Sequence, residues 1–165
     1  MNIFYLDHDP TKCAQAHCNK HVVKMILETA QILSQAVRDV CKIEYGYHVP
    51  KSELKNPCIK WVKESQENFL WLCNLGDALL NEYSYRYDNS HASEHIIKDV
   101  RVWHNRFPLV PMTTRPQLMP SEFQDPDPIT AYRHYYMGAK TGLLQYTRRT
   151  PPQWMQDMQL GEHKG

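Results

Sequence analysis

Ionisable and amide side chains recur at helical spacing between residues 11 and 40. They form a stripe of His17, His21, Lys24, Glu28, Gln31 and Gln35. Steps of three and four residues return to one face of a helix, so a single helix places these side chains in a line. The remaining positions are mostly apolar, which is typical of a helix enclosed by protein. Because a lone buried charge is costly, the stripe predicts a pocket wall. A solvated edge with a Lys24–Glu28 ion pair is the alternative.

Acid–base catalysis is the chemistry that this stripe suits best. Glu28 among apolar neighbours could hold a proton, unless Lys24 one turn away keeps it ionised, and either state can activate water or protonate a leaving group. A histidine such as His21 titrates near neutrality. We therefore expect Glu28, Lys24 and His21 to be catalytic, and His17 and Gln31 to bind substrate.

A metal site is a second interpretation of the same region. Cys13, His17 and His21 stand at i, i+4 and i+8, with acidic residues just upstream, so three or four ligands could converge. Such spacing recurs by chance in helices, and the paired CxxC and HExxH motifs are missing. The sequence therefore favours a His-lined pocket for a phosphate or a base, with no metal or other cofactor.

The segment 128–156 contains no acidic residue, and its basic residues alternate with aromatic ones. This composition suits phosphate contact together with base stacking. Two rings and an ammonium share one helix face at i, i+4 and i+8, an arrangement for a planar group beside an anion. The alternative is core tyrosines with solvated basic residues. The residues expected to bind substrate here are Tyr132, Arg133, Tyr136, Lys140, Arg148 and Arg149.

Size and composition limit the class of protein. A chain of 165 residues is long enough for one domain with a real core. The net charge of +1, from 19 basic and 18 acidic residues, gives no global basic field. Five cysteines are an odd number and do not suggest a disulfide framework. We find no signal peptide and no membrane-spanning run, so we expect a cytoplasmic protein without a membrane partner.

Helix starts are marked by an Asx residue followed by proline, where the Asx caps the helix and proline takes its first position. The sequence predicts an all-α, single-domain helical bundle over residues 1–165, with three to four main helices. A Pro-rich but ordered loop is expected at about 105–127, because its apolar residues have much to bury. The tail at 160–165 is expected to be frayed. The predicted helices cover residues 10–40, 57–87, 91–104 and 128–146.

The order of these features resembles the pyrimidine-dimer DNA glycosylases with AP-lyase activity, small all-α enzymes of the bacteriophage endonuclease V type. In that family a short N-terminal segment leads into a helix with a His and a catalytic Glu. A long aromatic-rich helix and an Arg-Pro-x-Trp-Tyr motif follow. The parallels here are Met1–Leu6, His17–Glu28, Asn56–Tyr87 and Arg149–Met155. Residues 21–31 also resemble small phage proteins of uncharacterised function.

The resemblance implies that Glu28 is the acid–base carboxylate and that an α-amine is the nucleophile. In the known enzymes this amine is exposed when the initiator Met is removed before a small residue. Residue 2 is Asn here, which does not favour removal of Met1, and the chain is near neutral whereas the family is basic. These departures indicate a changed substrate, such as a modified base, a nucleotide or a single strand.

The sequence as a whole favours a nucleic-acid-directed enzyme that acts at a glycosidic bond or a base, in base repair or base modification. Its partner would be nucleic acid or a nucleotide, in the cytoplasm of the host cell if the gene is phage-encoded. A non-catalytic binder of a small anionic ligand, such as a nucleotide or a signalling molecule, is the alternative. A metal-dependent hydrolase is the third interpretation.

Overall fold

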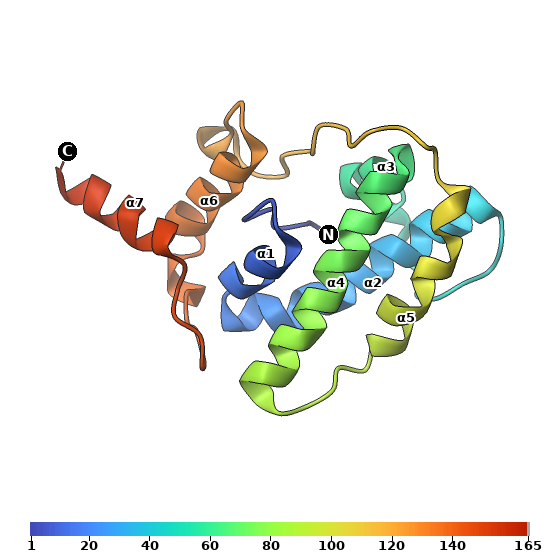
Figure 1. Ribbon diagram of the computed structural model, residues 1–165. Coiled ribbons are helices and arrows are strands. Elements are labelled where there is room, and N and C mark those ends of the chain that lie inside the picture. The colour runs from blue at the N-terminus through green and yellow to red at the C-terminus, as the bar shows by residue number, and fades with distance from the viewer. Residues whose placement is uncertain (165) are drawn as a thin grey trace.

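A computed structural model describes the backbone of residues 1–164 and the side chains of residues 1–161, and this part of the chain contains helices and no strand. The predicted all-α fold is confirmed (Figure 1). No helix in the described residues is both long and apolar enough to cross a membrane. The α-helices are α1 (Pro10–Ala16), α2 (Asn19–Cys41), α3 (Pro57–Glu64), α4 (Gln66–Tyr87), α5 (Glu94–Asp99), α6 (Pro128–Ala139) and α7 (Gln153–Lys164), and the 3₁₀ turns are η1 (Lys51–Glu53), η2 (Val100–Arg106), η3 (Ser121–Phe123) and η4 (Thr141–Leu143).

The predicted helix 10–40 is wrong as a continuous element, because the chain leaves the helical conformation at His17 and Cys18. Their backbone ψ angles are 133° and 162°, which end α1 and turn the chain into α2. The His17 ring bonds back to the helix through Nδ1, 2.7 Å from the carbonyl oxygen of Cys13. His17 therefore lies at the end of α1, whereas the other five residues of the polar stripe lie on α2.

The predicted helix 57–87 is also wrong as a continuous element. Ser65 is extended, with φ −155° and ψ 139°, and separates α3 from α4. Its Oγ accepts hydrogen bonds from the amides of Glu67 and Asn68 at 3.1 and 3.4 Å. A serine in this role satisfies backbone donors that a new helix leaves unpaired.

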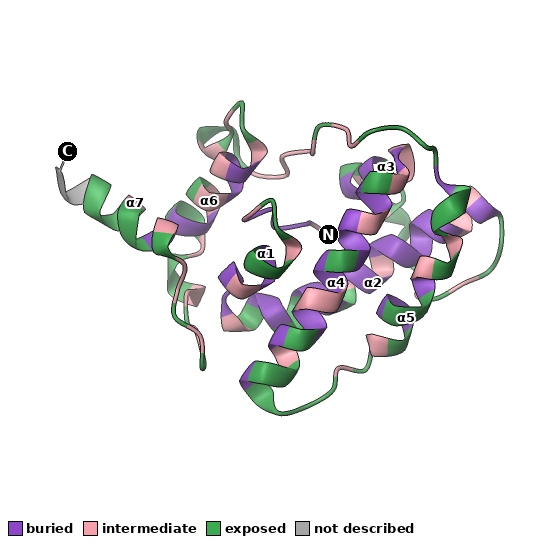
Figure 2. Cartoon of the chain, in the orientation of Figure 1, coloured by how far each residue is buried: buried purple, intermediate pink, exposed green. Residues whose placement is uncertain are grey.

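The core lies between α2 and α4, with α1, α3 and α5 packed against them. Purple segments in Figure 2 mark the buried residues along these helices. The N-terminal segment 3–6 has no regular secondary structure and is buried in the same core. All five cysteines are free and buried. The larger side chains that are fully buried include Leu6, Ile26, Leu33, Phe69, Leu72, Ile97, Tyr132 and Tyr136.

The Pro-rich segment 105–127 crosses from η2 to α6, with η3 as its longest regular element after Arg106 (Figure 1). Its middle is held by side chains of the bundle. The Oγ1 of Thr113 donates to Glu64, 2.6 Å away, and the Arg115 guanidinium lies 3.2 Å from the centre of the Tyr5 ring. These contacts hold the segment in one conformation, as expected for an ordered loop.

The C-terminal helices differ from the expected pattern. The helix predicted over 128–146 ends at Ala139, and α7 begins at Gln153, where no helix was predicted. The tail 160–165 overlaps the end of α7. Gly165 and the side chains of 162–164 lie outside the described residues, so fraying of this tail stays a prediction.

Candidate active site

The start of the chain folds back onto Glu28, near the middle of α2. The α-amine of Met1 lies 3.9 Å from Glu28 Oε1 and 3.4 Å from Glu53 Oε2. The backbone N–H of Asn2 donates to the same Glu28 oxygen at 3.2 Å. The side chains of Met1 and Glu28 are only 7% and 12% exposed. A primary amine and a carboxylate therefore meet in a largely enclosed place.

The second oxygen of Glu28 has a different environment. Oε2 lies 3.7 Å from Nζ of Lys24, but it is buried and has no hydrogen-bond partner among the described residues. The Lys24 side chain is 66% exposed. A buried carboxylate oxygen normally accepts a hydrogen bond, and no described residue donates one to Oε2.

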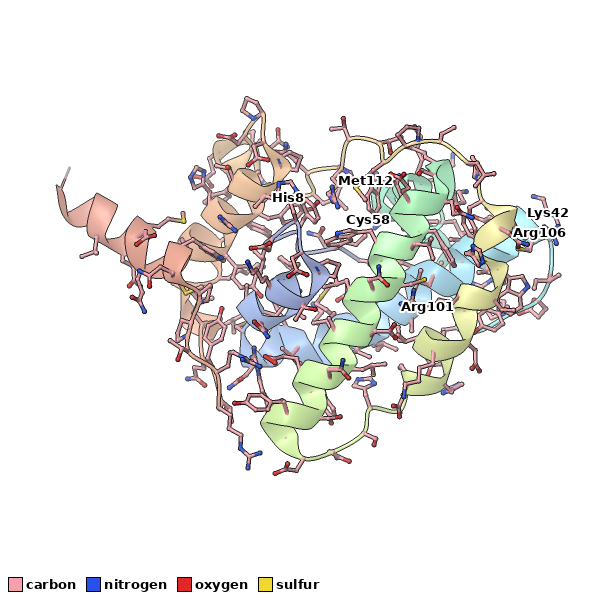
Figure 3. The ribbon with its side chains drawn as sticks, in the orientation of Figure 1. His8, Lys42, Cys58, Arg101, Arg106 and Met112 are labelled. Atoms are coloured by element: carbon pink, nitrogen blue, oxygen red, sulfur yellow. The ribbon has the colours of Figure 1, made fainter. Side chains whose placement is uncertain are left out.

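The side chain of Asn2 is fixed on both of its polar atoms. Oδ1 accepts from the Tyr132 hydroxyl at 2.8 Å and from the amide of Ile3 at 2.8 Å. Nδ2 donates to the carbonyl of Leu118 at 3.0 Å. Figure 3 labels Cys58 of α3, whose Sγ lies 4.0 Å from Asn2 Oδ1, and so marks the position of the site. Residue 2 is thus placed by groups from α3, α6 and the Pro-rich loop.

An open groove of about 700 Å³ lies beside Lys24. Its walls come from the start of α2, from Tyr87 and from residues 142–145. Burial is the main cause that lowers the pKa of His21, to about 3. Nearby positive charges, which include Lys140, Lys24 and Lys20, act in the same direction. Lys20 and Lys24 line the groove and concentrate positive charge there, although the net charge of the chain is only +1.

Comparison with known proteins adds to this geometry. The family model described as pyrimidine dimer DNA glycosylase matches residues 1–95, more than half of the chain. The chain belongs to the pyrimidine dimer DNA glycosylase family. The match contains the α-amine, Glu28, Glu53 and α1 to α4. No curated protein and no solved structure shows a significant match to the chain.

The two histidines are core side chains in this glycosylase fold. Burial lowers the pKa of His17 to about 4, so His17 and His21 are both neutral at pH 7. Nδ1 of His21 is 2.6 Å from the Tyr136 hydroxyl, and the Phe4 ring stacks on its imidazole at 4.4 Å. Neither histidine can supply positive charge to a phosphate in this state, contrary to the expectation for a His-lined phosphate pocket.

The tyrosines of α6 are placed as core residues. Tyr132 and Tyr136 are 1% and 0% exposed, so neither ring face is open to a base in this conformation. Lys140 lies over the Tyr135 ring, 4.8 Å from its centre. The guanidinium of Arg133 donates to the Leu6 carbonyl at 2.9 Å. The predicted line of two rings and an ammonium is therefore part of the packing.

The remaining predicted residues lie in other environments. Arg149 donates to both oxygens of Glu82, at 2.7 and 3.0 Å, and this pairing competes with the predicted phosphate contact. Arg148 is exposed and pairs with Asp88 at 3.0 Å. Gln31 is half-buried one turn beyond Glu28. The stripe thus does not line one cavity, since its members face the core, the groove and the chain start.

The suggested metal ligands do not assemble in the described residues. There, no three His, Cys, Asp or Glu side chains come close enough together to hold a metal ion. The Cys13 thiol donates to the Phe4 carbonyl at 3.2 Å, and burial raises its pKa to about 12. A neutral thiol is a poor metal ligand.

Sequence reasoning missed Glu53, Asn2 and the connecting role of Tyr132. Asn56 caps α3, and its Nδ2 also donates to the Met1 carbonyl at 2.9 Å and to Glu53 at 2.7 Å. No local pattern predicts the contacts with Met1 and Asn2, because they join residues far apart in the chain. The α-amine was indicated only through the resemblance to the family.

Proposed function

We propose that this protein is a DNA glycosylase that excises a damaged or modified base, with an α-amine as nucleophile and Glu28 as acid–base group. The observation that carries the proposal is the approach of the chain start to Glu28, at 3.9 Å from the Met1 amine and 3.2 Å from the Asn2 nitrogen. Membership of the glycosylase family supports it.

The proposed reaction forms a bond between the amine nitrogen and C1′ of the sugar and breaks the bond between C1′ and the base. The base leaves with the bonding electrons and takes up a proton, while the amine loses its protons. Opening of the sugar ring at O4′, which takes up the second proton of the amine, then gives an imine between the amine and C1′. Loss of a proton from C2′ of this imine and cleavage of the bond between C3′ and its phosphate oxygen, which leaves with the phosphate, would cut the strand. Glu28 would accept a proton from the attacking nitrogen and stabilise positive charge that develops on the sugar.

The geometry suits either of two amines. If Met1 is retained, its amine lies between Glu28 and Glu53. If Met1 is removed, the Asn2 nitrogen becomes the amine, and it already lies 3.2 Å from Glu28. The intact mass of the purified protein distinguishes the two states and does not depend on activity.

We propose that DNA lies across the groove at the start of α2. Lys20 and Lys24 would contact phosphates there, and the exposed Val23, 41% accessible, offers an apolar contact to the sugar or the bases. Lys24 joins this surface to the acid–base carboxylate through its 3.7 Å ion pair with Glu28.

Incision and trapping assays test the proposal. UV-irradiated duplex DNA and an oligonucleotide with an abasic site are incubated with the protein, with and without borohydride, which reduces an imine to a stable adduct. Glu28→Gln should slow incision by about 100-fold or more, since it removes a proton acceptor but keeps the shape of the side chain. DNA binding should persist.

Glu44→Gln is the matched control, because Glu44 is an exposed carboxylate on the segment after α2 that pairs with exposed His48. It should incise DNA like the unchanged protein. Absence of both incision and adduct with these substrates would contradict the proposal and favour a non-catalytic binder. A Glu28→Gln rate equal to that of the unchanged protein would exclude Glu28 as the acid–base group.

A further inference from the structure

We infer that Tyr132 of α6 is a positioning residue that sets the place of residue 2 against Glu28, and that the chain beyond the family match thereby completes the active site. This inference rests on the proposed glycosylase function. Residues 1–95 contain the amine and the carboxylate, whereas Tyr132 and its loop partners lie outside that range. The family match alone therefore does not describe how the nucleophile is held.

The Tyr132 hydroxyl connects three segments. It donates to Asn2 Oδ1 at 2.8 Å, with the Pro116 carbonyl as a longer alternative acceptor at 3.2 Å. It accepts from the amide of Leu118 at 3.2 Å. The ring is 1% exposed, so water cannot easily replace these partners. Burial also raises the pKa of the phenol well above 10 and keeps it a donor.

Asn2 links Tyr132 to Glu28, because its side chain bonds to Tyr132 and its backbone nitrogen bonds to Glu28. Asn2 Oδ1 is held by Tyr132 and Nδ2 by the Leu118 carbonyl, so the side chain cannot rotate without losing a buried hydrogen bond. Its backbone nitrogen points at Glu28 Oε1. Because the nucleophile must keep a defined approach to C1′, a shift of about 1 Å at residue 2 can slow the reaction by up to about 100-fold.

Tyr132→Phe is the test, because it removes the hydroxyl and keeps the buried ring. Tyr146→Phe is the matched control, since its hydroxyl also donates to a backbone carbonyl, that of Ala16, but does not touch residue 2. The first measurement is the rate of borohydride trapping on DNA with an abasic site, at saturating DNA. Tyr132→Phe should lower this rate by about 10- to 100-fold with an unchanged half-saturating DNA concentration, and Tyr146→Phe should not.

The second measurement does not need activity. The amide of Ile3 donates to Asn2 Oδ1 at 2.8 Å, so its hydrogen exchange, followed by NMR, reports on the order of residue 2. Tyr132→Phe should raise this exchange rate about 10-fold relative to core amides, whereas Tyr146→Phe should leave it unchanged. Asn2→Leu removes the other partner of the bond, and Tyr132→Phe should have no further effect on Ile3 exchange in that background.

The outcomes separate the two proposals. If the unchanged protein traps no DNA, the proposed function fails, and Ile3 exchange alone decides whether Tyr132 holds residue 2. If the unchanged protein traps DNA, both the trapping rate and Ile3 exchange must change in Tyr132→Phe. Behaviour of Tyr132→Phe equal to that of the unchanged protein in either measurement overturns the inference.

Discussion

Glu82 is a position at which a single substitution should strongly destabilise this fold. Its carboxylate, 4% exposed, pairs with Arg86 at 2.9 Å and accepts two hydrogen bonds from Arg149. The Arg86 side chain is fully buried and also donates to Asn19 and to the carbonyl of Gln15, both at 3.1 Å. Glu82→Gln keeps the shape of the side chain and leaves the Arg86 charge without a counter-ion.

Removing one partner of a buried ion pair costs about 3–5 kcal/mol. A domain of this size has a free energy of unfolding of about 5–15 kcal/mol, so the loss is a large fraction of the total. At about 2–4 °C per kcal/mol, Tm should fall by about 6–20 °C. Urea titration and thermal unfolding, both followed by circular dichroism, measure the change.

Glu94→Gln is the matched control. Glu94 and Lys98 have the same i,i+4 spacing as Glu82 and Arg86, but their side chains are 40% and 62% exposed. An exposed pair contributes little to stability, so this substitution should give no resolvable change. A Glu82→Gln variant within about 1 kcal/mol of the unchanged protein would refute the reasoning, because the buried Arg86 charge would then need no carboxylate.

Two further predictions concern charge elsewhere. Burial keeps the pKa of His17 at about 4 and of His21 at about 3, below their value of about 6.5 in an unfolded chain, so unfolding takes up protons between these values. The free energy of unfolding should therefore be greatest above pH 6.5 and fall towards pH 4. In urea titrations at pH 7, 6, 5 and 4, His17→Asn should make this fall less steep. A fall as steep as that of the unchanged protein would contradict the prediction. In gel-shift titrations at several salt concentrations, Lys20→Ala should reduce the slope of log DNA affinity against log salt by about 1, whereas Arg149→Ala should leave it unchanged because Arg149 is paired with Glu82. Equal slopes for Lys20→Ala and the unchanged protein would exclude the groove as the phosphate contact.

The helix starts could be predicted because their causes are local. Asp9, Asn56 and Asp127 each accept a hydrogen bond from a backbone amide two or three residues on, as the Asx-Pro pairs indicate. The break at His17 has no such signal, since neither Gly nor Pro occurs there. The break at Ser65 had one, a serine ahead of Gln-Glu-Asn, but the apolar periodicity on both sides obscured it.

Only part of the site could be predicted from the sequence. A polar stripe singled out Glu28, but it placed His17 on the same helix, and His17 and His21 are both buried in the core. The partners of Glu28 and Asn2 are separated from them by 26 and 130 residues of chain. Contacts of that range depend on tertiary packing, and periodicity within one segment does not contain them.

The buried cysteine thiols can report on local opening of the helices around them. Cys13 lies in α1, Cys18 precedes α2, Cys41 ends it, Cys58 lies in α3 and Cys73 lies in α4. Cys13, Cys18, Cys58 and Cys73 are at most 1% exposed, so an alkylating reagent reaches their sulfur atoms when the surrounding element opens, and labelling rates rank these elements by their opening free energies. Cys58, beside Asn2, reports on the active site itself without an engineered probe.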